Sequence, residues 1–174
     1  LVAPLSSFAE PSAEPPASGQ SLDPSALWST WSGAGEVEMR GDYLIDFGLV
    51  VEIGGVPRLE RANSPVGIAD VGALLIHAPH GNFQGFRDGR IRLQSNVVLR
   101  HGERSVALDG LEAEGARIER HAALRLLDGQ GRHLVTVSHP HVEADHRRGV
   151  LSIRKADLLG TAELARLLDL PVLD

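Results

Sequence analysis

Histidine and carboxylate side chains alternate along one stretch of the chain, between residues 139 and 145. In an extended strand, side chains two residues apart lie on the same face. Four potential ligands would then share a face: His139, His141, Glu143 and Asp145. Imidazole and carboxylate together suit zinc and other first-row divalent metals. The spacing therefore predicts a metal site, in which Glu143 or Asp145 could act as the base for a metal-activated water.

A second histidine pair, His77 and His80, lies in the segment HAPH. These imidazoles would join the same metal if the fold brings the two segments together. Neither segment matches a motif of known mechanism, such as H-E-x-x-H. Two interpretations therefore stay open: a site for zinc or another divalent metal, and a protein without any cofactor.

Pro140 supports a structural interpretation of the same stretch. An unbroken strand would place the His139 side chain on the face of Val137, and burying charged groups beside valines is costly. Proline lacks an N–H and is tolerated mainly on edge strands and at bulges. The alternative to a metal site is thus a polar edge strand that runs into a turn, with Leu151 and Ile153 returning to the core.

The elements that position these side chains are predicted to be β-strands. The 174 residues are 43% hydrophobic but only 4% aromatic, and they include 19 glycines and 10 prolines, so one domain with many turns is expected. Turn signals recur at intervals of about 8–12 residues, which is typical of sandwiches and barrels. We expect a mostly β fold: an antiparallel β-sandwich or barrel-like domain, with an extended Pro-rich N-terminal arm and one short C-terminal helix.

Individual strands and turns follow from the local pattern. Residues 43–53 form the longest β-like run and are predicted to be a central strand. Residues 63–65, Asn-Ser-Pro, are expected to interrupt the next strand, and Asp88-Gly89 to form a hairpin turn. Further turns are predicted at residues 101–103 and 128–131.

The two ends of the chain differ in composition. Residues 1–26 are rich in Pro, Ser and Ala, which predicts a flexible arm or linker that would add to a partner as a strand. Residues 27–174 are predicted to form a single β-rich domain ending in a helix at about 161–169. Thr161 can cap that helix, and Pro171 ends it.

Composition excludes several classes of function. The net charge of −6, without a basic run, argues against nucleic acid as a partner. No apolar run approaches the length of about 18 residues that a transmembrane helix needs, so no transmembrane segment is expected. The absence of cysteine removes thiolate catalysis and cysteine-ligated metals.

The expected function is that of an exported, non-enzymatic structural or interaction protein. No G-x-S-x-G, phosphate-loop or dinucleotide pattern supports an enzyme. The first residue is Leu1, and the Pro/Ser/Ala-rich start favours a removed signal peptide and a secreted, periplasmic or cell-surface location. The predominance of arginine over lysine suggests a bacterial, GC-rich coding sequence. Expected partners are further copies of the chain, through self-assembly of the arm, or other cell-envelope proteins.

Two alternatives remain open. The first is a divalent-metal-binding protein or metal-dependent hydrolase that uses the stretch from His139 to Asp145. The second is a carbohydrate-binding or adhesion module, in which Trp28 and Trp31 stack on sugars or the tripeptide Arg40-Gly41-Asp42 binds an adhesion receptor.

Overall fold

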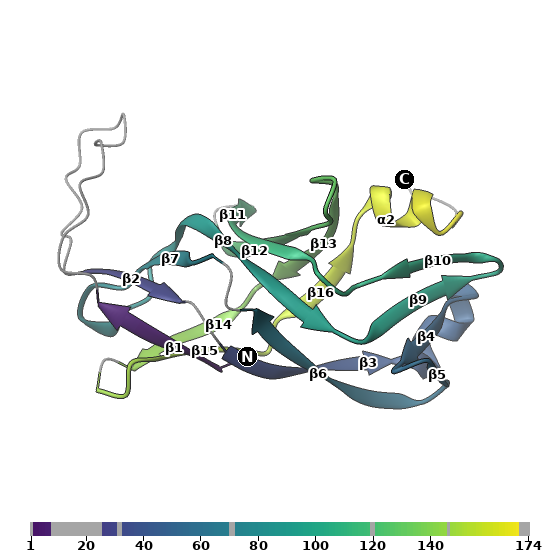
Figure 1. Cartoon of the computed structure of the whole chain (residues 1–174), viewed down its shortest axis with the longest axis horizontal. Helices are drawn as coiled ribbons and strands as arrows, with labels where there is room; N and C mark the ends of the chain where they lie inside the picture. Colours follow the sequence, from purple (N-terminus) through teal and green to yellow (C-terminus); the bar gives the residue numbers. More distant parts are fainter. Residues whose placement is uncertain are drawn as a thin grey trace.

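The structure is a computed structural model that describes residues 2–7, 26–30, 33–69, 72–118, 121–145 and 147–170. These residues form mainly antiparallel strands in more than one sheet, with one short C-terminal helix, α2 (Ala162–Leu167) (Figure 1). The predicted mostly β, antiparallel fold with a C-terminal helix is confirmed. Among the described residues, no helix has the length and apolar character needed to cross a membrane.

Twelve strands belong to one large sheet. They are β1 (Val2–Ser7), β2 (Leu27–Thr30), β3 (Gly33–Arg40), β6 (Arg61–Ala69), β7 (Leu74–His77), β8 (Gly85–Ser95), β11 (Glu112–Ile118), β12 (His121–Leu127), β13 (His133–Ser138), β14 (His141–Asp145), β15 (Val150–Arg154) and β16 (Asp157–Gly160).

Several of these strands are two halves of one longer, bent strand. The register that pairs Ser138 with Asp157 continues unchanged where His141 pairs with Arg154, so β13 with β14 and β15 with β16 form one bent hairpin. β2 and β3 likewise run along β7 and β6, but with a register shift of three residues between the two halves. When each bent strand is counted as one strand, strands that follow each other along the chain are neighbours in the sheet. The last strand also pairs with the first, through β15 and β1. The pairing therefore closes into a barrel-like ring.

The second sheet has four strands in the order β10 (Arg104–Ala107), β9 (Val97–His101), β4 (Val50–Ile53) and β5 (Val56–Arg58). Its strands come from two insertions, one between β3 and β6 and one between β8 and β11. Figure 1 shows this sheet at one end of the molecule, with α2 beside β10. The insertions thus create an edge strand, β10, close to a helix from the far end of the chain.

One apolar core joins both sheets and α2. It includes Ile76 of the large sheet, Val51 of the small sheet and Leu168 just after α2, all of them fully buried. Thr161 fixes the start of the helix: its hydroxyl accepts a hydrogen bond from Leu164 N (3.3 Å) and donates one to the His133 carbonyl (2.6 Å). The predicted Thr161 cap is confirmed, and α2 is tied to β13.

The prediction of a central strand over residues 43–53 is wrong for its first half. The chain forms α1 (Gly41–Leu44) and the 3-10 turn η2 (Ile45–Phe47) before β4 begins. Gly48, with φ of 72°, ends this helical segment in a left-handed conformation that favours glycine. Ile45 and Phe47 are consequently 44% and 48% exposed. Apolar residues in so short a run do not distinguish a strand from a helical turn.

Two predicted breaks also lie inside strands. Pro65 is part of β6, opposite Glu36; pairing with β8 begins only at Val66, so this part of β6 is an edge where proline is tolerated. Gly89 is part of β8 and has φ of 85°, next to a register irregularity between β7 and β8. Asp88-Gly89 therefore forms a bulge instead of a hairpin turn. The turns after His101 and Asp128 are confirmed.

The start of the chain takes part in the large sheet. Residues 2–7 form β1, which pairs with β15, β2 and β3. The remainder of the predicted arm up to residue 25 lies outside the described residues. The division into an arm over residues 1–26 and a domain over 27–174 stays a prediction.

Candidate functional site

The predicted ligands of β14 lie on the exposed face of that strand. His141, Glu143 and Asp145 are exposed, whereas Val142 and Ala144 on the other face pack against the core. His141 Nε2 lies 3.2 Å from Glu143 Oε1. Asp145 Oδ1 accepts hydrogen bonds from the main-chain N–H groups of the following turn. Leu151 and Ile153 are buried, as the edge-strand interpretation predicts.

His139 lies outside both strands. The chain leaves β13 at Ser138, and His139 takes a left-handed conformation with φ of 49° before Pro140. Its Nδ1 lies 2.9 Å from Ser138 Oγ, and its ring contacts the ring of His121. The four predicted ligands therefore do not form one unbroken row.

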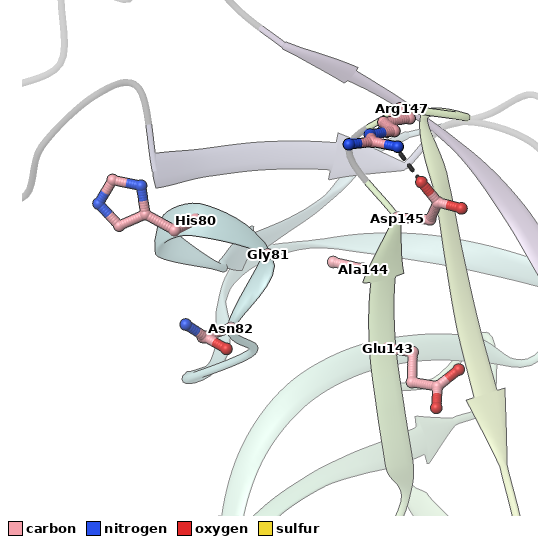
Figure 2. A pocket seen from close by; sticks show the side chains of 7 residues that line it. All are labelled: His80, Gly81, Asn82, Glu143, Ala144, Asp145 and Arg147. Carbon is pink, nitrogen blue, oxygen red and sulfur yellow. Dashed lines mark hydrogen bonds between the residues drawn. The ribbon is translucent and has the colours of Figure 1, made fainter.

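The structure brings His80 to the same depression as Glu143 and Asp145. This open cavity of about 460 Å³ lies between the 3-10 turn η3 (Pro79–Gly81) and β14, and Arg147, just after β14, also lines it. Figure 2 shows the His80 ring pointing away from β14, so it does not face the two carboxylates. The two histidine segments approach each other without converging on one point.

His77 takes a different environment, because its Nδ1 lies 3.0 Å from the Arg87 guanidinium. Within the described residues, no group of three or more His, Asp or Glu side chains is arranged to hold a metal ion. The assignment of His139, His141, Glu143, Asp145, His77 and His80 as metal ligands stays a prediction.

A second depression, of about 500 Å³, was not predicted from the sequence. One side is formed by five consecutive residues from Glu103 to Ala107, which are the whole of β10 and the residue before it. The other side is formed by Asp128, Arg132, Leu134 and Leu167 from the β12–β13 hairpin and α2. We call this depression the β10 groove. A face of a strand would present every second residue. Because consecutive residues line the groove, the edge of β10 borders it.

The main-chain groups of β10 that point into the groove can be assigned from the register. Leu108 N donates a hydrogen bond to Val97 O (2.9 Å), and Val106 pairs with Leu99. Main-chain groups in an antiparallel ladder face alternate sides. The N–H and C=O groups of Ser105 and Ala107 therefore point away from β9. Within the described part of the chain, β10 has no strand on that side.

The opposite edge of the small sheet is different, because β5 contains Pro57. A proline on an edge strand removes a donor and hinders the addition of another strand. The edge of β10 contains no proline. The small sheet thus has one hindered edge and one edge that keeps its main-chain donors.

An ion pair forms the rim of the β10 groove. Asp128 accepts hydrogen bonds from Arg132 Nε (2.7 Å) and from the main-chain N–H groups of Gln130 and Arg132 (both 2.9 Å). Burial alone would raise the pKa of Asp128, but these hydrogen bonds together hold the pKa of this carboxyl below its ordinary value. Asp128 is thus negatively charged at neutral pH and fixes the hairpin that borders the groove.

The residues of the carbohydrate-binding and adhesion alternative lie elsewhere. Trp28 is buried, with 8% of its surface exposed, and Trp31 lies outside the described residues. The guanidinium of Arg40 and the carboxylate of Asp42 form an ion pair with each other (2.9 Å). Comparison with protein-family models, curated proteins and solved structures finds no match for this chain.

Proposed function

We propose that this protein is a non-enzymatic interaction module that binds an extended segment of another polypeptide in the β10 groove. The observation that carries the proposal is the edge of β10, which points the main-chain groups of Ser105 and Ala107 into a groove. An extended peptide can add to such an edge as a further antiparallel strand, and its main chain supplies the complementary donors and acceptors.

Side chains in the groove suit a peptide with an apolar residue. Leu134 is buried under the groove, and the partly exposed Leu167 stands on the side of α2. An apolar side chain of the bound strand would contact both leucines, while main-chain bonds to β10 set its register. The charges at the rim, from Arg104, Asp128 and Arg132, would contribute to selection among peptides.

The composition of residues 1–26 supports placing this module outside the cytoplasm, in the periplasm, at the cell surface or in the medium. Self-assembly and other envelope proteins remain the proposed sources of the extended segment. Because residues 2–7 already pair within their own chain, the segment we propose is another stretch of polypeptide, not β1.

The test is a selection of random linear peptides on the immobilised full-length chain, followed by affinity measurement by fluorescence anisotropy. Ala107→Pro removes the N–H that points into the groove and leaves the bonds of Val106 and Leu108 to β9 in place. Ala107→Ser, which keeps that N–H, is the matched control. Loss of one such hydrogen bond is expected to weaken peptide binding about tenfold.

Two results would contradict the proposal. One is a selection that enriches no peptide. The other is an enriched peptide that binds Ala107→Pro as tightly as it binds the unmodified protein. Thermal unfolding of both variants checks that a loss of binding does not come from a loss of fold.

A further inference from the structure

A pair of histidine rings lies where the bent β13–β14 strand passes the start of β12. The ring centroids of His121 and His139 are 5.6 Å apart, and the ring planes meet at 53°. Both residues are exposed. His139 belongs to the stretch in which histidine and carboxylate side chains alternate. His121 does not, because it lies 18 residues earlier in the chain, at the start of β12.

The backbone of His139 brings the two rings together. The register between β12 and β13, extended beyond Leu124 and Val137, places Ala122 opposite His139. In a regular strand the His139 side chain would therefore lie on the face opposite to that of His121. The left-handed conformation of His139, with φ of 49°, redirects its side chain toward His121. Such a conformation is unfavourable for a residue other than glycine, and strain of this kind clusters at functional sites.

The surrounding structure maintains this bend from both sides. Pro140 follows His139 and cannot continue the ladder with an N–H. On the facing strand, Lys155 also has a left-handed conformation, with φ of 50°, between β15 and β16. Both strands of the hairpin are thus bent at the same level.

We infer that His121 and His139 together bind one late first-row divalent cation, such as zinc or copper(II). Two imidazole nitrogens that bind one cation at about 2.0–2.1 Å place their ring centroids about 5–6 Å apart, which is the separation found here. Imidazole is a preferred ligand of these metals. With two protein ligands, the remaining positions are filled by water or by a ligand from outside the chain.

Ser138 supplies a hydrogen-bond partner for the His139 ring nitrogen that does not bind the cation. Its Oγ lies 2.9 Å from His139 Nδ1. Metal-binding histidines commonly donate the proton of the other ring nitrogen to an oxygen, which fixes the tautomer and the ring orientation. With the proton on Nδ1, the Nε2 lone pair of His139 is the one that binds the cation.

Three other described histidines have partners that hold their rings apart from this pair. They are His133, whose Nε2 lies 3.0 Å from Thr136 Oγ1, His101, whose Nδ1 lies 2.8 Å from the Leu168 carbonyl, and His141, which lies beside Glu143. Among the described residues, His121 and His139 are the histidines whose rings contact each other.

The test is a titration of the full-length chain, without an affinity tag, with zinc chloride and separately with copper(II) chloride, followed by calorimetry. We expect one cation per chain with a dissociation constant in the micromolar range or tighter, and tighter binding of copper(II) than of zinc. His121→Ala and His139→Ala should each weaken binding at least tenfold. His141→Ala, which removes another exposed histidine of the same hairpin, should leave the affinity unchanged.

A structural readout is provided by NMR of the imidazole groups, in which zinc should shift the signals of His121 and His139 together. Three results would overturn the inference: no binding, binding that survives in the double variant His121→Ala/His139→Ala, or binding lost in His141→Ala but kept in His121→Ala. The last result would move the cation to β14. Because the substituted side chains are exposed, thermal unfolding without metal should be nearly unchanged.

Discussion

Replacement of Thr161 by alanine tests how the groove-forming helix is held. The hydroxyl of Thr161 caps α2 by accepting from Leu164 N and binds β13 by donating to the His133 carbonyl. Loss of a helix cap costs about 1 kcal/mol, and loss of a hydrogen bond to a main-chain carbonyl costs about 1 kcal/mol more. Thr161→Ala should therefore lower the free energy of unfolding by about 2 kcal/mol.

For a chain of this size, 1 kcal/mol corresponds to about 2–4 °C in the midpoint of thermal unfolding, so we expect a decrease of about 4–8 °C. The assay is thermal unfolding followed by circular dichroism, with urea unfolding as a second measure. Thr161→Ser keeps the hydroxyl and is the matched control. Equal destabilisation by alanine and serine would refute the reasoning, because it would assign the effect to the methyl group of the threonine.

Two further predictions concern the other side of the groove and the bulge in β8. Because the pKa of Asp128 is lowered in the folded state, its carboxylate stabilises the protein above the unfolded pKa of about 4, and this stabilisation is lost as pH falls below that value. Asp128→Asn should thus cost about 1 kcal/mol at pH 7, and the difference from the unmodified protein in urea unfolding should shrink progressively as pH falls below about 4. Gly89→Ala would place a methyl group against the Ala73 carbonyl oxygen at a positive φ, so it should cost at least about 2 kcal/mol in thermal unfolding. Gly129→Ala, where nothing lies near the added carbon, should be nearly neutral, and equal effects of the two substitutions would contradict the assignment of the bulge.

The strands with plain alternation and clear turn signals could be predicted from the sequence. The turn after Asp128 and the Thr161 cap are predicted correctly, because each depends on residues close together in the chain. Pro65 and Gly89 lie inside strands, although their residue types predict breaks. Their role depends on which neighbouring strand is present at that position, and local sequence does not contain this information.

The candidate sites depend even more on distant parts of the chain. The β10 groove combines an insertion with α2, and the pair of His121 and His139 depends on the register between two strands and on one left-handed residue. A residue directly before a proline favours extended backbone, so the left-handed conformation that turns the His139 ring toward His121 could not be predicted from the sequence. The partner of His139 could not be identified without the strand pairing.

Amide hydrogen exchange measured with and without a selected peptide tests the central claim most directly. If a peptide adds to the edge of β10, the amides of Ser105 and Ala107 should exchange more slowly in the complex, because their N–H groups donate to the bound strand. The amides of Val106 and Leu108, which already face β9, should change little. Slower exchange elsewhere, with Ser105 and Ala107 unchanged, would contradict the account and move the binding site away from the β10 groove.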